Sequence, residues 1–381
     1  MAPNSSNYHI ASGRIPSLDG LRAISILLVI ALHSLQRYSV NHHVPLVFYD
    51  LCNGSLGVQI FFVISGFLIT ALLLQERRKF GSISLSGFYI RRAFRILPPL
   101  YTYIAVVALI GISGRIILNR NDIISAVLFF HNYSRSSSMW SLEHLWSICI
   151  EEQFYLVWPF ILCACLAGDG VEHRLRAAVF PVAVLAISPP LRTILGLQHS
   201  HPILRDIGLK INYDFIMFGC LIALLQGVPR FETIYRIVTR IWWIWPIAIF
   251  LLGAISMRFE HYFDLPIGYT ITGAAIAIFI LWCTRNPDRA VGRALNFRPI
   301  VQIGVLSYSI YLWQTLFLHH LNYQVFGRYS WIGSFPSNWI AILIVAAFSY
   351  YVIEKPSLRL RLRLIESFHL DRSSRLRPAP R

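Results

Sequence analysis

Ten apolar runs, each close to the length of a membrane-spanning helix, constrain the fold of this 381-residue chain more than any other feature. A helix needs about 20 mostly apolar residues to cross the hydrocarbon core of a bilayer. The runs predict helices over residues 18–36, 56–75, 93–113, 145–167, 178–197, 209–227, 241–257, 267–283, 300–320 and 338–354. A further apolar stretch, 123–131, is too short to span and is predicted to be interfacial or re-entrant. We therefore expect an all-α, polytopic membrane bundle of about ten transmembrane helices.

The composition and the distribution of charge agree with this expectation. Hydrophobic residues make up 56% of the chain and charged residues 14%, whereas a soluble domain carries about 25% charged residues. The net charge of +16 would suit nucleic acid only if the basic residues formed a soluble face. Most of the 34 Lys and Arg residues lie instead in segments 1–17, 76–92, 168–177, 228–240, 284–299 and 355–381. The positive-inside rule places these segments and both termini in the cytoplasm, and we expect no nucleic-acid partner.

The chain divides into three predicted regions. They are an N-terminal cytoplasmic segment (1–14), one transmembrane domain (15–356) and a basic cytoplasmic tail (357–381). The first apolar stretch carries Asp19 and Arg22 and lacks a small-residue cleavage site, so it is predicted to be a retained helix rather than a signal peptide. In the tail, Arg359, Arg361 and Arg363 alternate with Leu, a pattern typical of an anchor that touches anionic lipid. The six cysteines lack zinc spacing, and no metal site is expected.

Charged side chains inside predicted membrane helices are the first candidates for a reaction centre, because each costs roughly 3 kcal/mol on insertion scales. The first helix holds Asp19, Arg22 and His33. His33 lies about three helical turns, or ~16 Å, after Arg22, so the two side chains share one face. Histidine is the side chain most easily poised as a base near neutral pH. A structural interpretation is also open, in which Asp19 pairs with Arg22 and His33 hydrogen-bonds a neighbouring helix.

A second charged motif, Arg91, Arg92 and Arg95, opens the third predicted helix on its cytoplasmic side. Arg92 and Arg95 lie one turn apart and can point the same way. Two guanidinium groups on one face suit bidentate recognition of phosphate. The alternative is a collar of positive charge against lipid headgroups, which explains Arg91 better than the more deeply placed Arg95.

A third motif brings His144, Glu151 and Glu152 to the start of the fourth predicted helix. His144 and Glu151 are two helical turns apart and are therefore predicted to share a face. The carboxylates could orient a histidine or an arginine, contact an acceptor hydroxyl group, or form a structural ion pair within the membrane. The Glu-x-x-His spacing of bundle di-metal sites is absent, which disfavours a metal here.

In combination, these motifs resemble the integral-membrane acyltransferase-3 family. The matching stretches occur in family order and cover most of residues 15–356. They are IPSLDGLRAISILLVIALH (15–33), GVQIFFVISGFLIT (57–70), FYIRRAFRILPPLY (88–101), HLWSICIEEQFYLVWP (144–159), LSYSIYLWQ (306–314) and YVIEKP (351–356). One departure is Gln314, which stands where many members of the family have histidine.

The resemblance implies transfer of an acyl group, commonly acetyl, from acyl-CoA to a hydroxyl group of a sugar or of another hydroxylated compound. It implies that His33 is the catalytic base and that Arg92 and Arg95 hold the phosphates of CoA entering from the cytoplasm. Arg22 or Glu151 would orient His33 or stabilise charge. His144, Glu152 and Asp19 would support them. The membrane implied is the inner (plasma) membrane of a bacterium, with lipid as the surrounding partner.

Two other functions are compatible with charges inside a membrane bundle. A transporter or flippase would line its substrate path with such residues, and internal repeats with broken helices would be its expected sign. We find no convincing repeat in the sequence. A non-catalytic lipid-binding scaffold would tolerate loss of His33. The sequence leaves open the acceptor, the acyl-chain length, the side of product release, the oligomeric state, and direct transfer as opposed to an acyl-enzyme.

Overall fold

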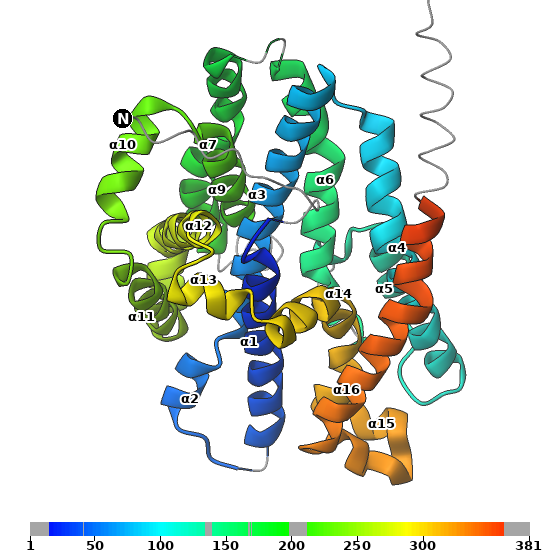
Figure 1. The fold of residues 1–381 in the computed structure, drawn as a ribbon. Coiled ribbons are helices and arrows are strands. Elements are labelled where there is room, and N and C mark those ends of the chain that lie inside the picture. The colour runs from blue at the N-terminus through cyan, green and yellow to red at the C-terminus, as the bar shows by residue number, and fades with distance from the viewer. Residues whose placement is uncertain are drawn as a thin grey trace, which may run out of the picture. The chain divides into compact units, whose positions relative to one another are not determined.

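The computed structural model describes residues 15–40, 42–133, 139–166, 168, 170–197 and 212–361, and these residues form helices and no β-strand (Figure 1). The predicted segment 1–14 and residues 362–381 of the predicted tail 357–381 lie outside the described residues. The chain divides into two compact units. Unit 1 combines Met1–Ile83, Phe129–Ser136 and Trp146–Ser307, and unit 2 combines Ser84–Leu128, Ser137–Leu145 and Tyr308–Arg381.

Unit 1 contains most of the helices that match the apolar runs. Its helices are α1 (Leu18–Ser39), α2 (Leu46–Leu51), α3 (Gly54–Phe80), α6 (Trp146–Cys165), α7 (Val171–Gly196), α9 (Tyr213–Leu225), α10 (Pro229–Val238), α11 (Ile244–Phe259), α12 (Tyr269–Arg285) and α13 (Ala290–Leu295). The 3₁₀ turn η1 (His131–Tyr133) and the π-helix η3 (Glu260–Gly268) also belong to unit 1, as does the first part of α14 (Arg298–Leu318).

Unit 2 is built on α4 (Leu85–Ile112) and on the C-terminal end of the chain. Its other helices are α5 (Arg120–Val127), α15 (Tyr323–Phe326), α16 (Ser337–Phe348) and the end of α14. It also holds the 3₁₀ turns η2 (Glu143–Leu145), η4 (His320–Asn322) and η5 (Gly327–Gly333), and the π-helix η6 (Ser349–Glu354). The predicted short segment 123–131 corresponds to α5, which has eight residues and cannot span.

Each of the ten predicted helices has a counterpart in the structure, which confirms an all-α, multi-pass membrane protein. Among the described residues, eight helices are long and apolar enough to cross a membrane. The predicted helices 209–227 and 241–257 are shorter in the structure, because α9 has 13 residues and α11 has 16. After α9 the chain bends by 117° into α10, at Gly227 with φ of +77° and at Pro229. If α9 and α10 form one broken span, the count rises to nine.

Close helix contacts in unit 1 depend on glycines of α3 and α9. A Cβ atom on Gly66 would overlap the backbone carbonyl of Ile216, and one on Gly219 would overlap the carbonyl of Val63. Because lipid tails are as apolar as leucine, membrane helices associate through such close backbone packing. The two glycines therefore fix α3 and α9 as the packed centre of unit 1.

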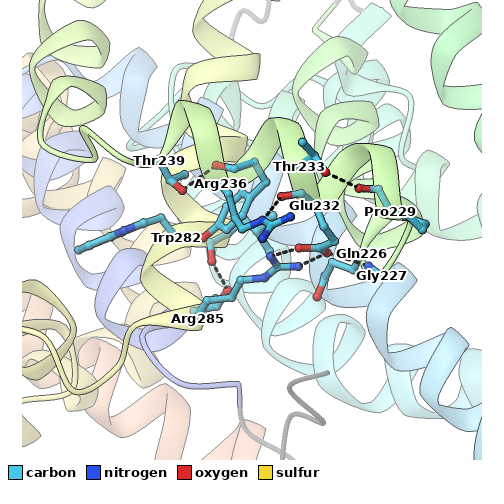
Figure 2. A network of polar contacts seen from close by, with 12 residues as sticks. Gln226, Gly227, Pro229, Glu232, Thr233, Arg236, Thr239, Trp282 and Arg285 are labelled. Carbon is cyan, nitrogen blue, oxygen red and sulfur yellow. Dashed lines mark hydrogen bonds and ion pairs between the residues drawn. The ribbon is translucent and has the colours of Figure 1, made fainter. Parts of the chain in front are cut away.

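A polar network holds the amphipathic helix α10 against the end of α12 (Figure 2). Arg285 donates a hydrogen bond of 2.8 Å to each carboxylate oxygen of Glu232, and the backbone N–H of Gly227 donates a third bond of 2.8 Å. The guanidinium group of Arg285 also lies 4.4 Å from the ring centroid of Tyr235. The two hydrogen bonds from Arg285 hold the pKa of Glu232 below its usual value. Bidentate pairs of this kind fix geometry as well as adding energy, so Glu232 and Arg285 set where α10 lies.

Candidate active site

The first candidate residues lie on α1, an uninterrupted helix over Leu18–Ser39. Arg22 Nη1 lies 3.4 Å from Asp19 Oδ1, and the two side chains are 16% and 20% exposed. The ion pair expected between them is therefore present. Gly304 fits against the backbone of Asp19, where a Cβ atom would overlap the Asp19 carbonyl, so this end of α1 is tightly packed.

His33 lies near the other end of the same helix and is half-buried. Along a continuous helix it is about 16 Å from Arg22. An extended arginine and a histidine cannot bridge that distance along the axis. That Arg22 orients His33 or stabilises charge stays a prediction, and the distance favours joint action through a substrate that reaches both.

Glu151 lies on α6 in a pocket of hydroxyl donors from unit 1. Ser65 of α3 donates a hydrogen bond of 2.8 Å to Glu151 Oε1, and the Tyr155 hydroxyl donates one of 3.3 Å to Oε2. Ser65 is only 8% exposed. A carboxylate that accepts two hydroxyl hydrogen bonds is fixed in orientation, and Ser65 is a residue that the sequence analysis did not single out.

The packing of α1 against α3 shows where Glu151 lies along α1. The two helices run antiparallel at their contact, because a Cβ atom on Gly54 would meet Leu32 and Val29, and one on Gly57 would meet the carbonyl of Ser25. Positions further along α3 therefore lie level with earlier positions of α1.

Ser65 follows Gly57 by eight positions, or about 12 Å along α3. This displacement brings Ser65 and its partner Glu151 level with the Asp19–Arg22 pair. His33 lies on the opposite side of the contact, and the axial offset between Glu151 and His33 is on the order of 20 Å. That Glu151 orients His33 or stabilises charge likewise stays a prediction.

The residues next to Glu151 stabilise a loop. Glu152 is half-buried on α6. Gln153 donates hydrogen bonds of 2.7 Å to the carbonyl of Phe129 and 2.9 Å to Asn132 Oδ1, and it accepts one of 2.8 Å from the Tyr213 hydroxyl. The Glu-Glu-Gln sequence thus combines two candidate site residues, Glu151 and Glu152, with a structural one, Gln153.

His144 lies in unit 2 and not on the helix that carries Glu151. It is part of the 3₁₀ turn η2, and α6 begins two residues later at Trp146. That His144 and Glu151 share a face stays a prediction, because the two residues belong to different units.

The His144 ring is buried and fixed within unit 2. Its Nε2 atom lies 3.1 Å from the carbonyl oxygen of Leu312. The Tyr103 ring stands edge-on at 5.4 Å between centroids, and the Tyr311 hydroxyl donates a hydrogen bond of 2.9 Å to the carbonyl of His144. These contacts indicate that His144 positions the end of α14 against α4.

Arg92 and Arg95 also belong to unit 2 and lie inside α4, which begins at Leu85 and not near residue 93. Ser84 accounts for the earlier start, since its hydroxyl accepts a hydrogen bond of 3.2 Å from the backbone N–H of Gly87 and caps the helix. Arg92 lies over the Phe88 ring at 5.8 Å. The arginines therefore project from the second and third turns of a formed helix.

One buried ionic network was missed by the sequence analysis. Arg192 of α7 pairs with Asp214 of α9 at 3.2 Å, and both side chains have no exposed area. Thr270 donates a hydrogen bond of 3.0 Å to Asp214, and Arg192 donates one of 3.0 Å to the carbonyl of Leu265. Tyr269 stacks on the guanidinium group at 4.9 Å. The sequence signal was a lone arginine inside a predicted span, whose partner on another helix could not be identified from spacing.

Comparison with known proteins identifies the family. The acyltransferase domain profile of the acyltransferase-3 family matches residues 15–354. The peptidoglycan O-acetyltransferase OatA of Listeria monocytogenes is 30% identical over 367 residues, which cover 90% of this chain and 55% of that protein. YrhL of Bacillus subtilis, a candidate peptidoglycan O-acetyltransferase, is 30% identical over 366 residues, which cover 90% of this chain and 54% of that protein. This chain thus spans about half the length of these relatives.

No solved structure matches the chain. The match to the profile extends from the start of α1 to the end of η6, so it includes each candidate residue described above. The relatives are bacterial, which agrees with a plasma-membrane location. The helices, the motifs and this match together show that the chain belongs to the acyltransferase-3 family of multi-pass membrane proteins.

Proposed function

We propose that this protein is a membrane O-acyltransferase that moves an acyl group, most simply acetyl, from acyl-CoA to a hydroxyl group of a carbohydrate. The observation that carries the proposal is the placement of Arg22 and His33 on one uninterrupted membrane helix in a chain of this family. The names of the relatives support O-acetylation and a carbohydrate acceptor.

In the proposed reaction, His33 removes the proton from the acceptor hydroxyl group. The oxygen attacks the thioester carbonyl, the tetrahedral intermediate collapses with cleavage of the carbon–sulfur bond, and the proton returns from His33 to the sulfur of CoA. The products are an ester and free CoA. Direct transfer needs no protein nucleophile, so no acyl-enzyme is required.

Arg22 and Glu151 have a different part in this scheme from His33. Both residues lie at the height of the first turns of α1. Measured along the helix axis, Arg22 is about 16 Å from His33, and Glu151 is on the order of 20 Å from it. We propose that they bind parts of the substrates remote from the reacting atoms, or charge that builds up there, and that His33 alone acts as the base. Arg92 and Arg95 supply guanidinium groups suited to the phosphates of the donor.

The alternative is a transporter or flippase for a polar substrate. Broken helices are typical of transporters, and the bend between α9 and α10 is one such break among the described residues. The buried Arg192–Asp214 pair is also of a kind found on substrate paths. A test must therefore separate transfer from transport.

The test uses membranes with the full chain and acetyl-CoA labelled separately in its acetyl and CoA parts. The proposal predicts acetyl label in alkali-labile esters and one released CoA for each ester formed. Transport predicts that both labels cross the membrane together and that no ester forms. His33→Ala should abolish ester formation, whereas His43→Ala, at an exposed histidine just beyond α1, should leave it unchanged. Equal ester formation by His33→Ala and wild type would reject the proposed base.

A further inference from the structure

The strongest unexplained feature is a cluster of arginines in unit 2, in which two further arginines lie near the candidate residue Arg95. Arg91 and Arg95 lie one helical turn apart on α4 and therefore project from the same face. The guanidinium group of Arg361, at the end of the last described helix, interacts electrostatically with both of them. Arg361 lies in the segment that the sequence analysis interpreted as a lipid anchor.

The fold explains how residues so far apart in sequence meet. The π-helix η6 packs against α4, and the helix continues from Glu354 to Arg361 (Figure 1). Seven further residues carry the chain about 10 Å beyond Glu354. Glu354 itself is buried at 3% exposure and accepts a hydrogen bond of 3.4 Å from Ser309. These contacts fix the helix at Glu354. The helix then brings Arg361 close to the turns of α4 that hold Arg91 and Arg95.

One atom of the Arg361 guanidinium group is buried without a hydrogen bond. Within the part of the chain that the structure describes, its Nε atom is buried and has no hydrogen-bond acceptor. The whole residue is half-buried, whereas the neighbouring Arg359 is exposed. A guanidinium group removed from water beside two like charges is unfavourable unless an anion neutralises it. An anion with several acceptor oxygens would satisfy both requirements.

We propose that Arg91, Arg95 and Arg361 form a binding site for a phosphate group. Guanidinium groups present planar forks of donors that match phosphate oxygens. Three guanidinium groups near enough to interact electrostatically suit the charge of a phosphate better than that of a carboxylate. The site extends the motif of Arg92 and Arg95 by Arg91 from the same helix and by Arg361 from the far end of the chain.

The phosphate can come from two sources with the same chemistry. One is the acyl donor, since CoA carries a diphosphate and a phosphomonoester, and this source rests on the proposed function. The other is the headgroup of an anionic phospholipid, which does not rest on it. In both cases Arg361 donates hydrogen bonds to the phosphate oxygens.

The test measures binding, without turnover, by the purified full-length protein. The probes are CoA, pantetheine (which has no phosphate) and nanodiscs that contain phosphatidylglycerol. Arg361→Gln should weaken the binding of one of the two phosphate ligands by about 10-fold or more, which is the loss expected for a charge-assisted hydrogen bond. It should leave pantetheine unaffected. Arg359→Gln removes the same charge from the exposed neighbour. It should bind CoA and pantetheine as the wild type does, and phosphatidylglycerol more tightly than Arg361→Gln does.

The pattern of loss identifies the source. Loss of CoA binding alone assigns the phosphate to the donor, and loss of phosphatidylglycerol binding alone assigns it to a lipid headgroup. Arg361→Lys, which keeps the charge but not the fork, should lie between the wild type and Arg361→Gln. If Arg361→Gln binds CoA and phosphatidylglycerol as tightly as Arg359→Gln does, there is no phosphate site at Arg361. Because catalysis is not measured, this outcome is distinguishable from failure of the proposed transfer reaction.

Discussion

Ser65 of α3 donates a hydrogen bond of 2.8 Å to Glu151 of α6, and this bond fixes a membrane carboxylate level with Arg22. A hydrogen bond to a charged group contributes about 1.5–3 kcal/mol. Ser65 therefore positions the carboxylate of Glu151, and so also positions any substrate group that Glu151 binds.

Removing the Ser65 hydroxyl should impair acyl transfer by about 10-fold, because Glu151 loses its shorter hydrogen bond. Ser65→Ala and Glu151→Gln are compared by kcat and KM for ester formation. Ser65→Thr, which keeps a hydroxyl group, should restore much of the activity. Tyr155→Phe, which removes the longer bond of 3.3 Å, should have a smaller effect. Full activity of Ser65→Ala would show that the orientation of Glu151 is irrelevant.

Breaking the Arg192–Asp214 pair should destabilise the protein by about 3–5 kcal/mol, because one buried charge is left without its partner. The melting temperature in detergent of Arg192→Met and of Asp214→Asn measures this effect. The double variant Arg192→Met/Asp214→Asn should be more stable than the sum of the single losses predicts, since neither charge remains. Additive losses would indicate that the two residues act independently.

Acidification should release α10 from α12. The hydrogen bonds from Arg285 lower the pKa of Glu232 in the folded protein, so its contribution to stability is present above the unfolded pKa of about 4.3. That contribution is lost as pH falls through the folded value. The protection factors of amides in Pro229–Val238, which are corrected for the intrinsic pH dependence of hydrogen exchange, should therefore fall between neutral pH and pH of about 3. The variant Glu232→Gln should exchange faster already at neutral pH and lose this dependence, and an unchanged profile would contradict the role of the pair.

Gly66→Ala should lower the melting temperature by several degrees, because its Cβ atom would overlap the backbone carbonyl of Ile216. Overpacking of this kind costs about 1–3 kcal/mol, and here backbone rather than a flexible side chain must move. Gly170→Ala is the control, since a Cβ atom there meets nothing closer than 3.9 Å. Similar melting temperatures for the two variants would show that α3 and α9 can separate freely.

The periodicity of apolar residues was sufficient to predict the helices, but not their ends or their side-chain partners. The N-terminal extension of α4 depends on the Ser84 cap, which lies in a polar stretch outside the apolar run. The 3₁₀ turn that holds His144 at the start of α6 was not distinguished from the helix itself.

Long-range partners were beyond prediction for a different reason. Ser65 and Glu151 are 86 positions apart, and nothing in their local sequences links them. The Asp19–Arg22 pair was predictable because both residues lie on one helix, where spacing determines distance. The same rule places Arg22 and His33 about 16 Å apart along α1.

The most direct test of the account is a single-turnover measurement of acetyl transfer by His33→Ala with donor binding measured in parallel. A general base contributes typically 10²–10⁴-fold to a rate. We expect ester formation to fall by at least about 100-fold, with CoA bound as tightly as by the wild type. Transfer at the wild-type rate by His33→Ala would contradict the assignment of His33 as the base.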